Sequence, residues 1–503
     1  MMRKILIIPV LLGFQAPAAA PEAWFDVMKY GAVADRNTNA AAAIQKAIDA
    51  CAKAGGGTVY LPAGNYLSGS LELKSNVTLH LSPGAVLWGS RRFEDYPGRA
   101  LIWARNADNI AIAGKGTIDG QDEAYFEPNF GKPKADRPTM VLLNKCTRVR
   151  IEGVTLRYAP AWTIHPKDCD GVWIRGIKLL NHVQAFNTDG IDLDSCRNVH
   201  ISDSYIEAGD DSIVLKTTQP SDGSQAGPCE NVTVTNCVLI SSASGFKLGT
   251  ESHGDFRHIV VSNCVIRRTW APLSFFLKDG GAVENVSFSN ITIHAFPEGR
   301  GYKVTWPIFV DLDKRWPDQT RLSSIRDISF SNIRILGKGR SRIAGMPERP
   351  IENVTLRNIV MRVDGFEPIE EVRKPGGGRS QPARPEADFG SIPAEFIFAH
   401  IRGLDVDDVQ VIWDTKEEAQ ERHAIWGKFL DGVRIHRFSG RQAVPDGKLP
   451  VIAFEDVKNV FVTESSAAPG AGVFLKVPAA AKSEVLLDGN DLRKARVPVE
   501  YAP

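Results

Sequence analysis

Apolar and polar residues alternate along most of the chain, from about Gly57 onward. A period of two predicts strands that bury one face. The alternation recurs as a short phrase, Asn-Val-polar-apolar or a close variant, at spacings mostly between 23 and 33 residues. Copies begin at Asn76, Asn109, Arg148, Gly171, Asn198, Asn231, His258, Asn285, Asp327 and Asn353, with weaker copies at Asp408, Gly432 and Asn459. Short strands repeating at this interval without helices between them predict a parallel β-helix, an all-β solenoid with one continuous Val/Ile/Leu core.

Longer gaps of 39, 42 and 55 residues interrupt the repeat. They predict loops that project from the coils, where function tends to concentrate. We interpret the longest interruption, about 364–391, as a surface loop because the strand pattern resumes after it. A β-sandwich or propeller is the structural alternative, but it needs hairpin turns and a period nearer about forty residues. The repeated Asn residues are expected to bond the backbone at turns or to form an Asn ladder.

One helix is predicted before the strands begin, from Asn39 to Ala54. Ile44, Ile48 and Cys51 fall on one face at helical spacing, and Thr38 or Asn39 can cap the start. A single amphipathic helix in front of a long β region is expected to cover the open end of the first coil, which repeat proteins need for solubility.

The first twenty residues have the pattern of a secretory signal peptide. Arg3 and Lys4 precede an apolar run from Ile5 to Phe14, which is too short to span a bilayer, and small residues follow it. A buried N-terminal strand is the alternative. We therefore expect a signal peptide over 1–20, a β-helix catalytic domain over 21–465, and a C-terminal cover or appendage of the same domain over 466–503. The protein is expected to be secreted or periplasmic, without a membrane partner.

Composition narrows the classes of partner. The chain is 43% hydrophobic and 24% charged, as in globular proteins, and its formal net charge is +1. Without a basic field, a nucleic-acid partner is not expected. Seven cysteines without a Cys-X-X-Cys pair argue against a zinc or redox site. Small buried core residues are their expected role, although a pairing of Cys229 with Cys237 stays open. We predict a monomer with no metal and no cofactor.

Two acidic clusters carry the predicted chemistry: Asn187-Thr188-Asp189-Gly190, and Gly209-Asp210-Asp211. Asp210 and Asp211 follow Asp189 by 21 and 22 residues, close to one turn of the coil. Because neighbouring strands lie roughly 4.8 Å apart, this offset predicts that the three carboxyl groups stack together. Gathered carboxylates raise the pKa of at least one member. A charged base beside a protonated acid is what glycosidic bond hydrolysis requires. The alternative is that these acidic residues and glycines only form the turns of the repeat and have no catalytic role.

These two clusters resemble the acidic signatures of the polygalacturonase family of glycoside hydrolases, family 28. The likeness extends from Phe25 to about residue 465 and includes three further phrases. These are Tyr30-Gly31-Ala32, Gly116-Thr117-Ile118-Asp119-Gly120 and Trp162-Thr163-Ile164-His165-Pro166. The resemblance implies a right-handed parallel β-helix and hydrolysis with inversion. It also implies that Asp210 is the general acid, that Asp189 and Asp211 hold and deprotonate the attacking water, and that Asn187 helps to hold the group.

Two other family signatures are altered. Ser244 stands where the family has the histidine of Gly-His-Gly, and His253 lies beyond that motif. Phe276-Leu277-Lys278 replaces Arg-Ile-Lys, so the lysine is kept and the arginine is lost. In the family this pair grips a galacturonate carboxylate, a task suited to a guanidinium fork. The loss puts an ordinary homogalacturonan substrate in question, whereas members acting on rhamnogalacturonan also lack the histidine.

Further substrate-binding candidates surround the two clusters. Lys216 and Lys247 either supply positive charge near the acids or are solvated outward side chains. Trp162 offers an apolar face and His165 a donor for a sugar, although a core role suits a Trp equally. A charged loop is expected to contain Trp306, Asp311, Asp313, Lys314 and Arg315.

The leading hypothesis is a secreted glycoside hydrolase that cleaves a pectin-type (galacturonan or rhamnogalacturonan) polysaccharide or oligosaccharide. A polysaccharide lyase on the same fold is the first alternative, in which the aspartates would bind calcium and a basic residue would abstract a proton. A non-catalytic carbohydrate-binding β-helix is the second. Calcium dependence and unsaturated products would discriminate between hydrolase and lyase.

Overall fold

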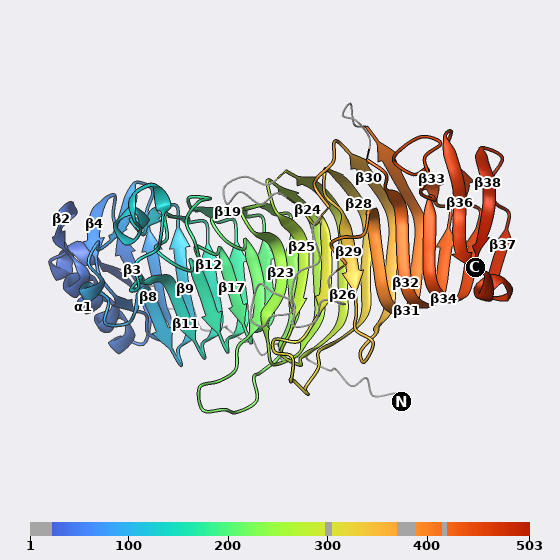
Figure 1. Cartoon of the computed structure of the whole chain (residues 1–503). Helices are drawn as coiled ribbons and strands as arrows, with labels where there is room; N and C mark the ends of the chain where they lie inside the picture. Colours follow the sequence, from blue (N-terminus) through green and yellow to red (C-terminus); the bar gives the residue numbers. More distant parts are fainter. Residues whose placement is uncertain (1–22, 297–303, 370–388, 415–419) are drawn as a thin grey trace, which may run out of the picture.

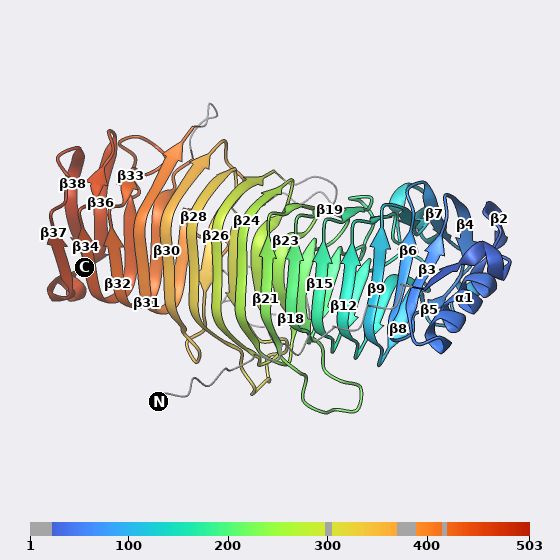
Figure 2. The same ribbon diagram turned by 180° about the vertical axis from the view of Figure 1, so that it is seen from behind.

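Parallel strands stack along the whole described chain and form an elongated solenoid (Figure 1). The computed structural model describes residues 23–296, 304–369, 389–414 and 420–503. Figure 2 shows the same coils from behind. The fold is the right-handed parallel β-helix that was predicted. The predicted signal peptide and most of the predicted 364–391 loop lie outside the described residues.

Each coil contributes strands to three faces of the solenoid. Face 1 contains β1 (Trp24–Asp26), β3 (Gly57–Leu61), β6 (Val77–Leu81), β9 (Asp108–Gly114), β12 (Thr147–Glu152), β15 (Asp170–Arg175), β18 (Arg197–Ser202), β21 (Cys229–Thr235) and β37 (Val485–Asp488). Face 2 contains β2 (Asp35–Asn39), β4 (Gly64–Ser68), β7 (Ala85–Gly89), β10 (Thr117–Asp119), β13 (Thr155–Arg157), β16 (Lys178–Leu180), β19 (Tyr205–Ala208), β22 (Val238–Ser241), β33 (Ser439–Gly440) and β35 (Ser466–Ala467).

Face 3 contains the strands that adjoin the acidic clusters. They are β5 (Leu71–Glu72), β8 (Ala100–Arg105), β11 (Thr139–Asn144), β14 (Ile164–Lys167), β17 (Ile191–Asp194), β20 (Ile213–Thr217), β23 (Ser244–Ser252), β25 (Ala271–Leu277), β27 (Ile308–Leu312), β29 (Ser341–Ala344), β36 (Ala471–Pro478) and β38 (Ala495–Ala502).

In the later coils, long strands bend from one face to the next. These are β24 (Phe256–Arg267), β26 (Ala282–Ala295), β28 (Ser324–Gly337), β30 (Ile351–Val363), β31 (Ala394–Trp413), β32 (His423–His436) and β34 (Ile452–Thr463). Short 3-10 helices lie in the connections: η1 (Val27–Tyr30), η2 (Phe93–Asp95), η3 (Asp122–Tyr125), η4 (Pro128–Phe130) and η6 (Ala479–Glu484).

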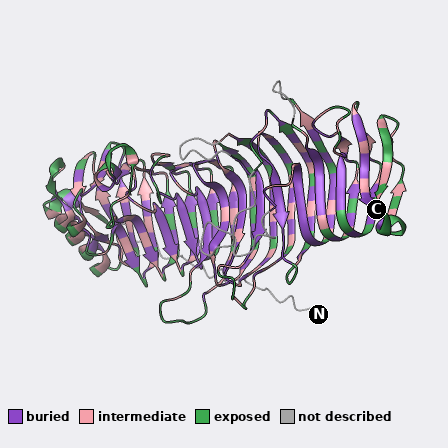
Figure 3. Ribbon diagram, viewed as in Figure 1, coloured by how far each residue is buried: buried purple, intermediate pink, exposed green. Residues whose placement is uncertain are grey.

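The core is built from columns of like residues in register. On face 1, the valine of the repeated phrase pairs with its counterpart in the next coil, as Val172 does with Val199 and Val199 with Val232. All three are buried. Aromatic rings fill the wider middle coils, where Phe288 stacks on Phe330 with ring centroids 5.1 Å apart. Figure 3 shows this burial as continuous bands along the strands.

The first residue of the repeated phrase turns the corner into each face 1 strand. It has a left-handed backbone, as at Asn76 (φ 62°), Asn109 (φ 54°) and Asn198 (φ 54°). Asn adopts this region more readily than other non-glycine residues. Side-chain amides also link neighbouring coils, since Asn109 donates to Asn76 at 3.0 Å and Asn231 to Asn198 at 3.0 Å. These contacts form an Asn ladder, which the sequence analysis gave as the alternative to backbone bonds at turns.

Helix α1 (Ala41–Lys53) covers the first coil, as predicted (Figure 1). Ile44, Ile48 and Cys51 are fully buried. The Asn39 side chain accepts a hydrogen bond from the Ala41 N–H at 3.0 Å, which satisfies one of the free donors at the helix start.

The solenoid continues beyond residue 465, where the sequence pattern weakens. β36 pairs with β34 and with β38, so this terminal region consists of further stacked strands. No residue of β37 or β38 is buried (Figure 3). The weak apolar pattern of these two strands agrees with their exposure.

All seven cysteines are free and buried, in agreement with the predicted core role, and Cys229 is not bonded to Cys237. Within the described ranges, no helix combines the length and apolar character required to cross a bilayer.

Candidate active site

The three aspartates occupy the turns that precede two paired strands of face 3. Asp189 lies just before β17, and Asp210 and Asp211 lie just before β20. Because β17 and β20 pair in parallel, with Ile191 opposite Ile213, their preceding turns are adjacent. One carboxylate oxygen from each aspartate lies within 4.8 Å of the others. The predicted stacking of the two motifs is therefore confirmed.

Two motif glycines allow this close approach. A Cβ on Gly190 would lie 2.4 Å from the Ser212 carbonyl oxygen. A Cβ on Gly209 would lie 2.3 Å from the Ala185 carbonyl oxygen and 2.4 Å from the His182 carbonyl oxygen. Both glycines permit backbone contact between adjacent turns.

Buried hydrogen bonds hold the turns in place. The Asn181 amide donates to the Thr188 carbonyl at 3.1 Å and to the Thr163 hydroxyl at 2.7 Å. On the other turn, the Ser241 hydroxyl donates to the Asp210 carbonyl and the Ser242 hydroxyl to the Gly209 carbonyl. The three donating side chains, Asn181, Ser241 and Ser242, fix the backbone of the two turns, and none of them was assigned a role from sequence.

The three carboxyl groups differ in exposure and in pKa. Asp189 and Asp211 are 3% and 2% exposed, whereas Asp210 is partly exposed. Burial, then the charges of Asp192 and Asp210, raise the pKa of Asp189 well above its usual value. Burial opposes ionisation of Asp211 as well, but Lys247 outweighs it and lowers the pKa of that carboxyl. Asp189 therefore retains a proton readily while Asp211 is ionised.

Lys247 is a direct partner of the site. Its Nζ lies 2.8 Å from Asp211 Oδ2, and the Ser244 N–H donates to Asp211 Oδ1 at 3.1 Å. The alternative of a solvated outward Lys247 is therefore wrong. Ser244 occupies the position of the lost histidine but contributes through its backbone, and Lys247 supplies the positive charge.

Asn187 connects the cluster to a residue that sequence reasoning missed. Its N–H donates to Asp210 Oδ2 at 3.2 Å, and its side-chain oxygen accepts from Arg137 at 3.2 Å. Arg137 also donates to the carbonyls of Pro160 and Phe186 at 2.9 and 2.8 Å. It lies in an irregular segment fifty residues before Asn187, where no repeat signal marks it.

A second charged group adjoins the cluster on the outer surface of face 3. Lys216 Nζ lies 3.1 Å from Asp192 and 3.9 Å from Glu251, and it is 4.2 Å from the centroid of the Trp162 ring. The solvated alternative is thus wrong for Lys216 also. Burial raises the pKa of Asp192 to about 6, with Lys216 and His165 opposing. Asp192 and Glu251 received no role from sequence.

Trp162 and His165 lie together at this second group. Their rings meet edge to face with centroids 4.7 Å apart, and the His165 Nε2 lies 3.9 Å from Asp194. Trp162 is partly exposed and His165 is 9% exposed. Trp162 stands beside Lys216, and the contact of Trp162 and His165 with a sugar stays a prediction.

Lys278 is engaged in a buried ion pair. Its Nζ lies 3.4 Å from Asp313 Oδ2, and the two side chains are 4% and 0% exposed. Nearby, Arg315 pairs with Asp279 at 2.5 Å. The predicted contact of Lys278 with substrate stays a prediction.

The expectation of a charged loop is wrong for Trp306 and Asp311, whereas Asp313, Lys314 and Arg315 lie in the connection after β27. Asp311 belongs to strand β27, and Trp306 is 1% exposed. Trp306 packs in a cluster of aromatic and aliphatic side chains on the outer surface of face 3, which includes Phe309 and Trp426. Both surfaces of β27 are buried, so its sequence lacks the alternation that identifies half-buried strands.

The spacing of the carboxylates defines the available chemistry. A water that donates one hydrogen bond to each of two carboxylate oxygens, at about 2.8 Å each, fits a gap of this size. Inverting glycosidases usually separate acid and base by about 6.5–9.5 Å, and retaining enzymes by about 5–5.5 Å. The 4.8 Å limit joins one oxygen of each aspartate and is compatible with either mechanism. Three clustered carboxylates are also a donor set that suits a hard cation.

An elongated β-helix with clustered aspartates at one face, of unequal pKa, defines a carbohydrate-active enzyme of the solenoid type. The sequence profile of glycosyl hydrolases family 28 matches residues 51–374, and the chain belongs to this family. It is therefore a glycoside hydrolase that acts on O-glycosyl bonds.

Known proteins resemble the chain over most of their length. The endo-polygalacturonase of Pectobacterium carotovorum subsp. carotovorum is 27% identical over 374 residues, covering 67% of this chain and 88% of that protein. Among solved structures, an exopolygalacturonase from Thermotoga maritima has a TM-score of 0.60 at 24% identity, covering 69% of this chain and 88% of that one. A family 28 exopolygalacturonase from Yersinia enterocolitica has a TM-score of 0.64 at 20% identity, covering 88% and 78%. These structures share the fold.

Proposed function

We propose that the protein hydrolyses glycosidic bonds of a pectin-type polysaccharide or oligosaccharide, a galacturonan or rhamnogalacturonan, outside the cytoplasm. The observation that carries this proposal is the cluster of Asp189, Asp210 and Asp211, whose oxygens lie within 4.8 Å of one another. Membership of family 28 and the similarity to polygalacturonases support the substrate class.

In this proposal Asp210 is the general acid. It is the partly exposed member of the cluster and so the one that a leaving oxygen can reach. Carboxyl groups this close titrate as a unit. The raised pKa of Asp189 keeps a proton in the cluster, and Asp210 delivers a proton to the leaving group.

Asp189 and Asp211 position the attacking water, and the ionised Asp211 takes its proton. Among the described residues, no hydrogen-bond donor contacts the buried Asp189 Oδ1, so this oxygen can accept from that water. Lys247 and the Ser244 N–H keep Asp211 ionised for proton transfer. We propose inversion, because a water held by two buried carboxylates attacks from the side opposite the partly exposed acid. The anomer of the first product distinguishes inversion from retention.

Positive charge for a uronate comes from different residues than in the family pattern. Arg137 carries a guanidinium beside Asn187 and is partly exposed. Burial lowers its pKa, while Asp189 and Asp210 raise it, which reflects its place beside the cluster. We assign it the fork-like grip on a substrate carboxylate that the lost arginine would make. Lys216 and Trp162 form the adjoining sugar-binding surface.

The test is the release of reducing sugar from a panel of pectic and other plant or algal polysaccharides by the unmodified protein and by Asp210→Asn. A positioned general acid contributes about 10²–10⁴-fold, so the variant should lose that factor in kcat. Its Tm should not fall, because the substitution removes a negative charge from a crowded group. Binding of a glycan without release by either protein would instead identify a carbohydrate-binding β-helix.

A calcium-dependent lyase is the second candidate, because the three clustered carboxylates could hold a cation. The same panel is run with and without EDTA, and products are examined for unsaturated sugars. Activity that resists EDTA and yields saturated products supports the hydrolase; loss of activity with EDTA together with unsaturated products supports the lyase.

A further inference from the structure

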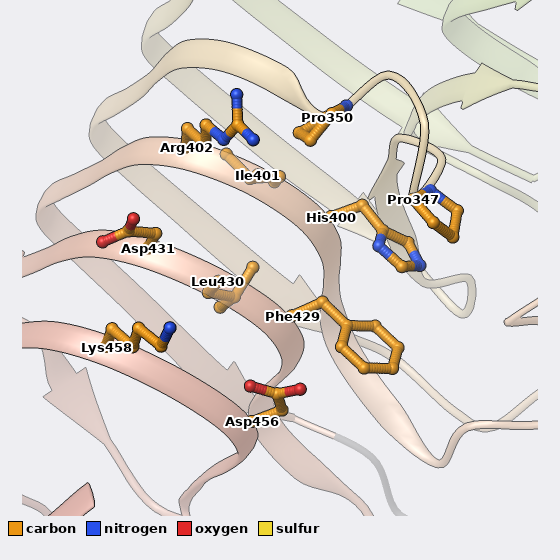
Figure 4. A pocket seen from close by; sticks show the side chains of 10 residues that line it. All are labelled: Pro347, Pro350, His400, Ile401, Arg402, Phe429, Leu430, Asp431, Asp456 and Lys458. Carbon is orange, nitrogen blue, oxygen red and sulfur yellow. The ribbon is translucent and has the colours of Figure 1, made fainter.

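A pocket distant from the aspartates opens at a corner of the late coils (Figure 4). Its volume of about 570 Å³ lies within the usual range of ligand sites. His400, Phe429 and Asp456 are equivalent corner residues of three successive coils, since the residues before and after them are in register. Arg402, Asp431 and Lys458 form a second, outward row across the same coils.

The pocket is separate from the site described above. Five strand pairings along face 3 lead from β20 to β31, which carries His400. At roughly 4.8 Å per pairing the separation along the solenoid is about 24 Å. The pocket also lies where the strands of face 3 end, whereas the aspartates precede them.

An aromatic ring in an unusual position borders this pocket. Phe429 has φ 56° and is 41% exposed. A left-handed backbone is strained for a bulky residue, and equivalent corners carry residues such as Ser195 and Asp168. His400 stacks on the ring with centroids 4.5 Å apart, and the Lys428 ammonium lies 5.1 Å from its centroid. The ring is therefore held by its neighbours and open to solvent, where a ligand can reach it.

The polar groups around the ring suit a sugar acid. Figure 4 shows Arg402 at one end of the pocket and Lys458 and Asp456 at the other. Arg402 offers a fork of donors for a carboxylate, and Lys458 a second cation. Asp431 and Asp456 offer acceptors for hydroxyl groups. An exposed aromatic face beside a few convergent polar groups is the composition of sites that bind amphipathic rings.

We propose that this pocket binds a short stretch of a carboxylate-bearing oligosaccharide, separate from the catalytic site. The substrate class rests on the proposed function: the occupant is another part of the acidic polymer that the aspartates cleave. Engaging one chain at two sites raises the effective concentration of substrate at the aspartates. Only a substrate long enough to occupy both sites gains this affinity, and short oligomers do not.

Calorimetric titration with galacturonate oligomers tests the proposal, using Asp210→Asn as the parent so that turnover does not interfere. Phe429→Ala and Arg402→Ala in that background should each weaken one binding event at least tenfold. Phe461→Ala is the matched control, because Phe461 is also 41% exposed but lies outside the pocket. Each variant must keep the Tm of the parent. A neutral oligosaccharide of equal length should bind at least tenfold more weakly.

Unchanged isotherms in both pocket variants, or equal binding of the neutral oligomer, would overturn the proposal. In the catalytically intact protein, Phe429→Ala should raise KM for polymer several-fold and leave cleavage of short oligomers unchanged. The proposed function fails separately: an unmodified protein that cleaves no pectic polymer, with oligomer binding still sensitive to Phe429→Ala, refutes the reaction and retains the pocket.

Discussion

At the scale of residues, the central feature is the unequal charge of three adjacent carboxyl groups. Asp189 and Asp211 are both almost fully buried, yet the pKa of Asp189 is raised and that of Asp211 is lowered. The difference comes from Lys247, which pairs with Asp211 at 2.8 Å. Burial alone would raise both values, so the position of one ammonium group separates a proton-holding carboxyl from a basic one.

Replacing Lys247 with Met should therefore shift the pH dependence of activity. Without the ammonium, the pKa of Asp211 rises, so the carboxylate needed as base forms only at higher pH. The acid limb of the kcat/KM profile should move to higher pH, and Lys247→Arg should retain most of the original position. A profile of unchanged shape with only a lower plateau would show that Lys247 acts on the fold and not on Asp211.

At the scale of elements, the turns before β17 and β20 depend on glycines that touch neighbouring backbone. We expect Gly209→Ala to displace the turn that carries Asp210 and Asp211, because the new Cβ would lie 2.3 Å from a carbonyl oxygen. Activity should fall by more than about 10²-fold, since catalysis depends on placement to within an ångström or so.

Gly176→Ala is the control for this substitution. Gly176, unlike Gly209, has a left-handed backbone (φ 60°), but a Cβ there would meet nothing within 4 Å. That variant should lose only about 1–2 kcal/mol from backbone strain and keep its activity. Thermal unfolding and kcat for both variants decide the matter; equal activity in the two would contradict the role assigned to Gly209.

A buried carboxyl also holds the segment before β27. Glu367 accepts hydrogen bonds from the Thr305 N–H at 2.5 Å and from its hydroxyl at 2.7 Å, and it is 6% exposed. Burial raises the pKa of Glu367 to about 7, against the opposing effects of Thr305 and two arginines. Since the folded protein then binds this proton more tightly than the unfolded chain does, the contribution of Glu367 to stability falls as pH rises from about 4.5 to about 7.

Glu367→Gln removes the ionisable group and with it this pH-dependent contribution to stability. The difference in Tm between the variant and the unmodified protein should change in favour of the variant as pH rises through that window. Scans at pH 4.5, 6 and 8 measure it, and a difference that does not vary with pH would refute the raised pKa.

At the scale of the whole molecule, the sequence was sufficient to predict the solenoid, the capping helix and the gathering of the aspartates. Each coil repeats the same local pattern, an Asn-like corner residue followed by alternating apolar positions, as at Asn198 and Val199. Such local rules repeat often enough to be visible. Contacts between distant irregular segments do not repeat along the sequence. The role of Arg137 could therefore not be predicted from the sequence pattern.

One misreading and one role left open have the same physical origin. The β27 segment was assigned to a loop because an aromatic cluster buries its outer surface and removes the alternation. Lys216 and Lys247 occupy outward strand positions, where solvated lysines are common, and only the neighbouring coils show that carboxylates surround them. The side chains of one coil are interpreted correctly only with the next coil in place.

Time-resolved proton NMR of the first product formed from an acidic oligosaccharide is the most direct test of water activation by the aspartate cluster. The account predicts a saturated reducing end whose anomer is opposite to that of the cleaved bond, appearing before mutarotation mixes the two, and its absence with Asp210→Asn. Vinyl proton signals would show elimination, and an initial product with the original anomer would show a covalent intermediate on one aspartate; either result would contradict hydrolysis by a water held between Asp189 and Asp211.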